Sequence, residues 1–449
     1  MEELYRSIFD AIERNRQIIL DAERYIWHNP ELGWREWKTH AYLKAQYENL
    51  GYVLHEAGDI PGFYVDIETG RPGPKVGVFG EMDALCIPAH PECDKETGAV
   101  HACGHHAQSA ALLGVAIGLK AFGLLEHLSG SIRLFAVPAE EILDHAFIDE
   151  MRKKGVLHMP QGKQEFIYRG YLDGVDMAIM VHGGPKGFSN NMGCNGSINK
   201  KFTFKGKAVH ASGAFDGHNA LYAATNALTA VNALRETFSR RDMAVFHPII
   251  TKGGMVINQI PDDVVVEGMV RGLTLPTLLK VSEQINRVFA AAAASMRCEL
   301  TIEDEFGLFP RTEDENLKDA FHDAAHMVYT PERIHRDYPA SAACTDMGDV
   351  SVLMPACHAH IGGGQGAIHT TEYRLADPVM ACVDCAKIQT ATLAILLSDG
   401  AERAKKVIAE GHPAFKNKEE YLAKRAEFSY IGNAVFYNED GTVTLKYMN

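Results

Sequence analysis

The segment AVHACGHHAQSAALL, residues 99–113, places a thiol and several imidazoles directly before an apolar run. Cys103 and His105 are separated by one residue, so both side chains can reach one cleft at the start of a helix. A thiolate and an imidazole are good ligands for zinc and similar divalent ions. The chain has 21 histidines, so chance pairs are expected, and this pair taken alone is better read as a buried structural cysteine beside surface histidines.

Further donor side chains stand at the ends of apolar runs elsewhere in the chain. Glu140 and Glu141 follow the run that ends VPA, and His182 ends the run MAIMVH. The glycine-rich stretch GGGQGAIHTTEY adds another imidazole far downstream. The expected ligands are Cys103, His105, Glu141, His182 and His369. Five ligands suit a pair of metal ions, and the remaining carboxylate of Glu140 suits a general base beside an activated water.

These side chains need an α/β scaffold to bring them together. Three segments each contain an apolar run that ends in polar residues: GPKVGVFGEMDAL, GSIRLFAVPAEE and VDMAIMVHGGP. Asp83 is one of these polar residues. A helix beginning near His105 lies between the first two, and strand–helix–strand spacing predicts a parallel sheet. Ligands of open parallel sheets bind at the carboxyl ends of the strands. We therefore predict a mixed, mainly parallel sheet flanked by helices, with the donor residues at one edge.

A different pattern begins near residue 195. Alternating or β-rich segments (SINKKFTFKGKAV, AVFHPIIT, DVVVEGMVRGLT, RCELTIEDEF) and two helical segments follow in the order β-α-β-β-α-β. This order is that of a ferredoxin-like sandwich. We predict a metal-binding catalytic domain of residues 1–194 and 309–449, interrupted at residues 195–308 by an inserted α+β lid or dimerisation domain.

Composition narrows the class of protein. Of the 449 residues, 46% are hydrophobic and 23% charged, which is typical of globular proteins. The net charge of -14, without a basic block, argues against nucleic acid and anionic membranes as partners. The N-terminal helix carries charges throughout and lacks the apolar core of a signal peptide. The sequence has no long uncharged apolar stretch, so we do not expect a membrane span. Nine scattered cysteines favour reduced thiols in the cytoplasm.

The ordered motifs MDAL, HACGHH, PAEE, VHGGP, KAVHAS, GGMVINQIPDD, VRG, DMGDVS and HTTEY resemble the aminoacylase/carboxypeptidase family of metallopeptidases. The similar branch contains aminobenzoyl-glutamate hydrolase, hippurate hydrolase and the auxin-conjugate hydrolases. The resemblance extends from the N-terminal helix to about residue 400, and the order of the motifs makes it specific. It implies hydrolysis of the amide bond of N-acyl or N-aroyl amino acids or small dipeptides. It also implies two divalent metal ions per subunit, zinc first, with manganese, cobalt or nickel as alternatives.

The resemblance assigns roles around the metal ions. Cys103 would bridge them, at the position where other members have an aspartate. Glu140 would take a proton from the bridging water and pass it to the leaving amine. Asp83 would orient one ligand through a hydrogen bond. The coordination would be completed by His105, Glu141, His182 and His369.

The inserted domain would supply substrate contacts. By resemblance, His210 would act across a homodimer interface and stabilise the oxyanion of the tetrahedral intermediate. Asn258 and Arg271 would hold the free carboxylate of the substrate, a task that suits a guanidinium. Purely structural roles are the alternatives. His210 could be an ordinary strand histidine, Arg271 could form an ion pair with Glu267, and Asp83, the residue assigned to orient a ligand, could cap a turn.

Other functions share part of the same residues. A non-catalytic metal-binding protein would use the same ligands, and a dipeptidase or carboxypeptidase of the same family would use the same centre. A thiol-redox enzyme could be built on Cys103 or on Cys382 and Cys385, although the latter pair reads better as two buried thiols. The sequence departs from the family pattern at His106, at Val137 and in the polar segment 86–99. Because of these departures, the sequence does not predict which acyl group and which amino acid the substrate contains, or which metal the protein prefers.

Overall fold

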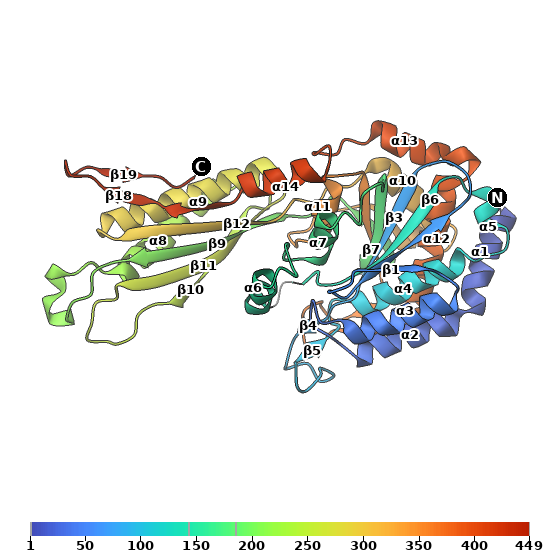
Figure 1. Ribbon diagram of the computed structural model, residues 1–449, viewed down its shortest axis with the longest axis horizontal. Coiled ribbons are helices and arrows are strands. Elements are labelled where there is room, and N and C mark those ends of the chain that lie inside the picture. Colours follow the sequence, from blue (N-terminus) through green and yellow to red (C-terminus); the bar gives the residue numbers. More distant parts are fainter. Residues whose placement is uncertain (1, 142–143, 185, 449) are drawn as a thin grey trace. The chain divides into compact units, whose positions relative to one another are not determined.

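The computed structural model describes residues 2–141, 144–184 and 186–448 (Figure 1). It divides into two compact units. The first comprises Met1–Met192, Thr312–Ala340 and Asp349–Lys418, and the second comprises Gly193–Arg311, Ser341–Gly348 and Glu419–Asn449. Each unit has its own sheet and its own buried helices.

The first unit is built on an eight-stranded mixed sheet. Its order is β1 (Leu54–Glu56), β2 (Phe63–Glu68), β6 (Ser131–Val137), β3 (Lys75–Glu81), β7 (Met177–Gly183), β14 (Ala356–Ile361), β8 (Phe188–Asn191) and β13 (Ile334–Tyr338). The central strands β6, β3, β7 and β14 run parallel. They read as nearly continuous apolar runs because both faces of a parallel sheet are covered. The predicted strands at MDAL, VPAEE and VHGGP are therefore confirmed.

Among the residues that the structure describes, the first unit has ten α-helices of four or more residues that lie wholly within it, and several of them cover this sheet in Figure 1. They are α1 (Glu2–Arg14), α2 (Arg16–His28), α3 (Trp37–Asn49), α4 (His105–Gly118), α5 (Leu124–His127), α6 (His145–Lys153), α7 (Gly162–Tyr168), α10 (Glu315–Ala325), α12 (Cys385–Leu397) and α13 (Glu402–Glu410). The helix predicted from His105 is α4, and every one of its residues is buried. It packs on β3, and α2 and α12 pack on it.

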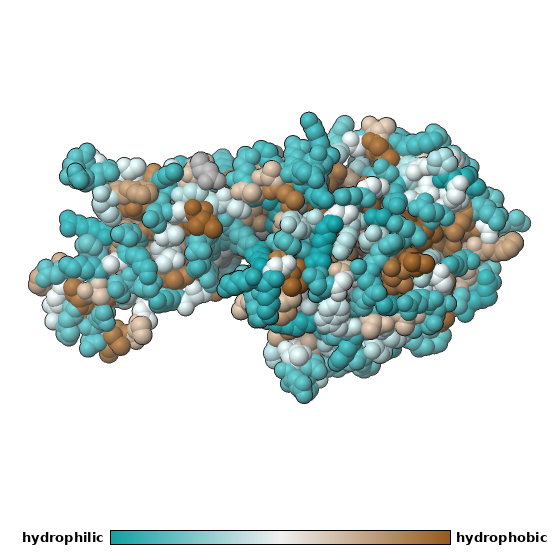
Figure 2. Space-filling model, viewed as in Figure 1, coloured by the Kyte–Doolittle hydropathy of each residue, from teal (hydrophilic) through white to brown (hydrophobic). Residues whose placement is uncertain are grey.

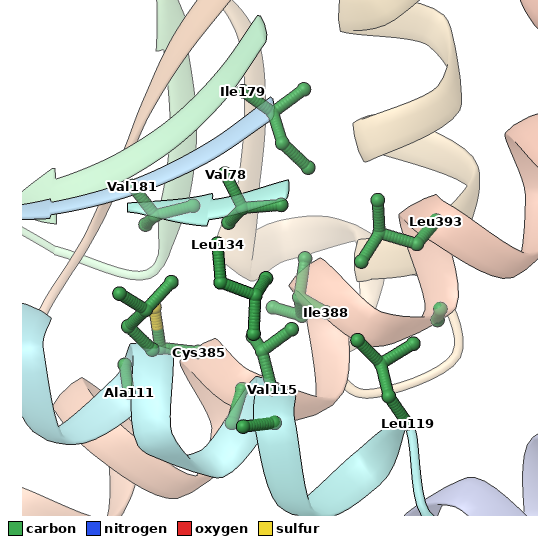
Figure 3. Close-up of a cluster of buried hydrophobic side chains, with 14 of the residues drawn as sticks. Val78, Ala111, Val115, Leu119, Leu134, Ile179, Val181, Cys385, Ile388 and Leu393 are labelled. Carbon is green, nitrogen blue, oxygen red and sulfur yellow. The ribbon is translucent and has the colours of Figure 1, made fainter. Parts of the chain in front are cut away.

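The core of the first unit lies between the sheet and helices α4 and α12. Figure 3 shows Val78, Leu134 and Ile179 from three strands facing Val115 of α4 and Ile388 of α12. The two helices approach closely because α4 carries glycines at the contact. A Cβ on Gly114 would lie 2.6 Å from the Ala386 Cβ, and a Cβ on Gly118 would lie 2.7 Å from the Thr390 hydroxyl.

The segment Val379–Leu397, which includes α12, is long and apolar enough to cross a membrane by length and composition, although it contains Asp384 and Lys387. Within the described residues, 78% of its apolar window is buried inside the protein, as in the core helix of a soluble fold. Cys382 and Cys385 lie on this segment and are buried free thiols, as predicted. The face drawn in Figure 2 is mostly hydrophilic, with hydrophobic residues in small scattered patches.

The second unit confirms the ferredoxin-like element order. Its elements are β9 (Gly196–Lys205), α8 (Ala220–Leu234), β10 (Val245–Lys252), β11 (Asp263–Gly272), α9 (Leu275–Ser295) and β12 (Glu299–Leu308). The antiparallel sheet has the order β10-β11-β9-β12, followed by a fifth strand, β17 (Tyr430–Asn433). A stack of aromatic rings, Phe202 on Phe289 with centroids 3.7 Å apart, packs α9 on the sheet.

One domain boundary differs from the prediction. Residues 309–449 were expected to belong wholly to the first domain, but residues 341–348 and 419–449 group with the second unit. The C-terminal segment does so because β17 pairs antiparallel with the edge of β12. Arg425 of α14 (Lys418–Glu427) also donates 2.8 Å hydrogen bonds to the carbonyls of Phe306 and Gly307. A hairpin of β18 (Val435–Tyr437) and β19 (Val443–Leu445) follows.

A buried charged cluster inside the second unit provides a stability prediction. Lys200 Nζ lies 2.8 Å from Asp304 Oδ2 and 2.7 Å from Asn286 Oδ1, and all three side chains are buried. Lys200→Met leaves the Asp304 charge buried without its cation, so we expect a loss of about 3–5 kcal/mol in the free energy of unfolding, measured calorimetrically. The control is Lys201→Met, whose pair with Glu303 is partly exposed and worth at most about 1 kcal/mol. Equal losses of unfolding free energy in the two variants would contradict a stabilising role of the buried Lys200–Asp304 pair.

Candidate metal centre

The first unit brings all five predicted ligands and Glu140 into one cluster. The donor atoms of Cys103, His105 and His182 lie within 4.8 Å of one another, and so do those of Cys103, Glu141 and His369. Those of His105, Glu140 and Glu141 form a third such group. Cys103 is common to the first two groups: its Sγ lies 3.4 Å from the Nε2 atoms of both His182 and His369. A thiolate placed in this way can contact two metal ions at once.

The five ligands reach the cluster from separate elements. Cys103 precedes α4, and His105 is the first residue of that helix. His182 lies in β7, and Glu141 follows β6. His369 has a φ of 62°, and its N–H donates to the Ala102 carbonyl at 2.9 Å, which ties its turn to the Cys103 loop. The strands end together at one edge of the sheet, as expected for ligands of a parallel sheet.

The loop that carries Glu140 and Glu141 is held by buried groups. Ala139 has a φ of 49°, and its N–H donates to Glu36 Oε1 at 2.7 Å. Its carbonyl accepts from the Gly162 N–H at 2.9 Å. A Cβ on Gly162 would lie 1.7 Å from the Pro138 carbonyl oxygen, so this close approach requires glycine. Burial, followed by the charge of Asp83, raises the pKa of Glu36 well above its usual value.

Asp83 fixes both sides of the cluster. His105 Nδ1 lies 3.0 Å from the Asp83 carbonyl and 3.1 Å from Asp83 Oδ1, both acceptors, so Nδ1 donates and Nε2 is the nitrogen that can bind metal. The other carboxylate oxygen of Asp83 accepts from the Glu141 N–H at 2.8 Å. The orienting contact proposed from the sequence is thus present, while its effect on the reaction stays a prediction.

Asp83→Asn tests this orientation. The amide can present its NH₂ group to His105 Nδ1 or to the Glu141 N–H, and either contact then lacks an acceptor. We expect metal affinity to fall by about 10–100-fold, measured by competition with a chromophoric chelator. Asp66→Asn serves as the control, because Asp66 pairs with Arg133 away from the cluster. Unchanged affinity in Asp83→Asn would remove the orienting role.

The electrostatics of the cluster favour a bound cation. Burial raises the pKa of the Cys103 thiol to about 12, so a nearby cation is needed to form the thiolate. Burial lowers the pKa of His105, but its interactions with Cys103 and with the carboxylates of Glu81 and Asp83 outweigh burial and raise that pKa well above its usual value. Burial and the charge of His105 lower the pKa of His182, which keeps its imidazole neutral. The donor set of one thiol, three imidazoles and a carboxylate fits two divalent ions.

Two neighbours of the cluster were not predicted from the sequence. Glu81 is fully buried and contacts both His105 and Lys163. Its position at the end of a buried strand, two residues before Asp83, is a signal that could have found it. Lys163, at the start of α7, gives no such signal, because a lysine that becomes buried looks like any surface lysine in the sequence.

Further histidines, including His106, pack around the ligands. His106 Nε2 lies 3.3 Å from Glu23 Oε1, and its ring centroid is 4.8 Å from that of Trp27. His358 and His360 on β14 stack with centroids 5.0 Å apart, and that of His358 is 5.8 Å from the His182 ring. His106 thus contributes to helix packing, and the β14 pair lines the side of His182.

The three predicted substrate residues lie in the second unit. His210 is exposed, and its Nδ1 accepts from the Ser212 N–H at 3.2 Å. Asn258 is next to it, because the Asn258 carbonyl accepts from the Ala211 N–H at 2.9 Å. Arg271 lies on β11, where its Nε is 3.3 Å from Met269 Sδ. Their roles toward substrate stay predictions.

Comparison with known proteins agrees with this geometry. The N-acetyl-L-cysteine deacetylase of Bacillus subtilis (strain 168) is 28% identical over 321 residues, covering 69% of this chain and 72% of that protein. One of the subunits of the p-aminobenzoyl-glutamate hydrolase of Escherichia coli (strain K12) is 27% identical over 344 residues, covering 74% and 67%. The Bacillus subtilis YXEP protein, a dinuclear metal binding peptidase, has the same fold: TM-score 0.69 at 20% identity, covering 86% of this chain and 99% of that one.

The family assignment rests on a match to most of the chain. The sequence profile of Peptidase family M20/M25/M40 matches residues 77–394, a range that contains every ligand of the cluster. The match confirms the resemblance drawn from the ordered motifs. The chain therefore belongs to peptidase family M20/M25/M40 and is a metallohydrolase that acts on amide or peptide bonds.

Proposed function

We propose that the protein hydrolyses the amide bond of N-acyl or N-aroyl amino acids or small dipeptides at two divalent metal ions. The observation that carries this proposal is the convergence of five ligands and one further carboxylate, with Cys103 shared between two groups of donors. The names of the two relatives described above, a deacetylase of an N-acetyl amino acid and a hydrolase of an aroyl-glutamate, support this substrate class.

Each residue of the cluster has a defined task in this proposal. When bound, the metal ions supply a Lewis acid and activate a water molecule. Cys103, His105, Glu141, His182 and His369 hold them. Glu140 takes the proton from the attacking water and passes it to the leaving amine. The hydrogen bond from the Gly162 N–H to the Ala139 carbonyl holds the backbone next to this carboxylate, which matters because proton transfer depends on hydrogen-bond distance.

Three further assignments belong to the same proposal. Zinc is the first candidate metal because of the thiol ligand, with manganese, cobalt or nickel as alternatives. A cytoplasmic location is supported by the nine free cysteines. A homodimer, with His210 acting across its interface, is supported by the exposed Val245, Ile249 and Ile250 on β10, an edge strand of the second unit's sheet.

The test is a hydrolysis screen of N-acyl amino acids, N-aroyl amino acids and dipeptides with protein reconstituted separately with each metal. We expect turnover of at least one class, and we expect a chelator to remove it. Hydrolysis of dipeptides alone would make the protein a dipeptidase of the same family. Tight metal binding without hydrolysis of any substrate would favour a non-catalytic metal-binding protein.

A further inference from the structure

We propose that Glu81 is an additional protein ligand of the metal centre, giving one carboxylate oxygen to the ion held by His105. This inference rests on the proposed function of the centre and adds a residue to its donor set. With Glu81, the centre would have one more oxygen ligand than the set of five ligands expected from the sequence.

The two oxygens of the Glu81 carboxylate have different surroundings. Oε1 accepts a hydrogen bond from Lys163 Nζ, and both side chains are buried from solvent. Oε2 is also buried and has no hydrogen-bond partner among the described residues. A buried carboxylate oxygen without a donor is costly, so a group that compensates it is expected at this position.

A metal-binding nitrogen lies close to this oxygen. Glu81 Oε2 lies 3.2 Å from His105 Nε2. Because Nδ1 of that ring donates to Asp83, Nε2 presents a lone pair to the Glu81 oxygen when the imidazole is neutral, which is the form that binds metal. Two lone pairs at this distance repel each other unless a cation lies beside both.

The distance itself suits two ligands of one ion. Zinc binds imidazole nitrogen and carboxylate oxygen at about 2.0–2.2 Å. Two such bonds, at an angle between tetrahedral and octahedral, place the nitrogen and the oxygen about 3–3.5 Å apart. The observed separation falls in this range, and the donor atoms of Cys103 and His182 are grouped around the same imidazole.

Lys163 explains how a further carboxylate can be accommodated. It holds Oε1, which leaves Oε2 as the oxygen that faces His105. Its positive charge offsets the negative charge that Glu81 adds to a centre already containing Cys103 and Glu141. Lys163 also follows Gly162 directly, so the backbone that supports the Glu140 loop also positions the lysine that orients Glu81.

The alternative cation is a proton on His105, which would make the contact an ordinary buried ion pair. The experiment that separates the two is metal binding to Glu81→Gln, an isosteric change that removes the charge of the carboxylate. Binding of zinc and of manganese is titrated by calorimetry, and bound metal is counted by elemental analysis. The control is Glu165→Gln, a buried carboxylate paired with Arg169 outside the donor set.

We expect Glu81→Gln to bind one of the two ions at least about tenfold more weakly while Glu165→Gln binds both as the unmodified protein does. Equal affinities of Glu81→Gln and the unmodified protein for both ions would overturn the ligand role and leave the proposed function intact. Absence of metal binding by the unmodified protein would overturn both.

A second measurement does not depend on the folding of a variant. A crystal structure of the unmodified protein loaded with manganese should show Glu81 Oε2 within about 2.2 Å of the ion that binds His105. A structure in which this oxygen contacts only a water molecule or the proton of His105 would overturn the proposal.

Discussion

Glu140→Gln should retain both metal ions and lose turnover, with kcat reduced by about 10²–10⁴-fold. The glutamine side chain has nearly the same shape, and Glu140 is not among the five expected ligands, so metal content should be unchanged. An amide cannot accept the proton of the attacking water at neutral pH, and it cannot deliver a proton to the leaving amine. The chemical step therefore loses its acid–base group while the geometry of the centre is kept.

The measurements are kcat with the best substrate from the screen and metal content by elemental analysis. Glu150→Gln is the matched control, because this carboxylate is exposed on α6 and pairs only with Lys154 in the described structure. If Glu140→Gln turned over at the normal rate, another group would have to be the general base. Loss of metal together with activity would instead place Glu140 among the ligands.

Cys103→Ala should have the second large effect, because it removes the donor common to both groups of ligands. Each ion would lose a thiolate and keep only its remaining ligands, so we expect affinity for both ions to fall by at least about 100-fold. Turnover should fall below detection at metal concentrations that saturate the unmodified protein. The measurements are metal titration and kcat at several metal concentrations.

The control for Cys103→Ala is Cys86→Ser, which changes an exposed free thiol outside the donor set. Retention of both ions by Cys103→Ala would contradict a bridging thiolate. Retention of one ion would show that Cys103 binds a single metal. The thiol-redox alternative makes the opposite prediction, since a redox enzyme built on Cys103 would lose activity without any change in metal content.

Much of the first unit follows from local patterns. The strands at KVGVFGE, SIRLFAV and MAIMVHG are apolar because they lie between layers of helices, and such runs are recognisable without a structure. Each of them ends near a polar residue, and parallel strands end at the same edge. The convergence of Cys103, His105, Glu141 and His182 could therefore be predicted from the order of elements alone. His369 lies far downstream and follows no predicted strand, so only its glycine-rich context indicated it before the resemblance supported its role.

The C-terminal segment illustrates what local patterns do not contain. Residues 430–433 form a short strand whose partner, β12, lies more than a hundred residues earlier in the chain. Pairing at a sheet edge is made mainly by backbone hydrogen bonds, which carry little sequence signature. For this reason the sequence assigned residues 419–449 to the first domain, whereas in the structure they group with the second unit.

The sequence by itself determined the element order, the parallel sheet and the identity of the donors, because hydrophobic periodicity and side-chain chemistry are local properties. The tertiary structure alone decided which atoms face one another. Glu81 and Lys163 are 82 positions apart, and their contact depends on the packing of α7 against the end of β3. Burial turns such a pair from two ordinary charges into strongly interacting ones, because a charge deprived of water needs a partner.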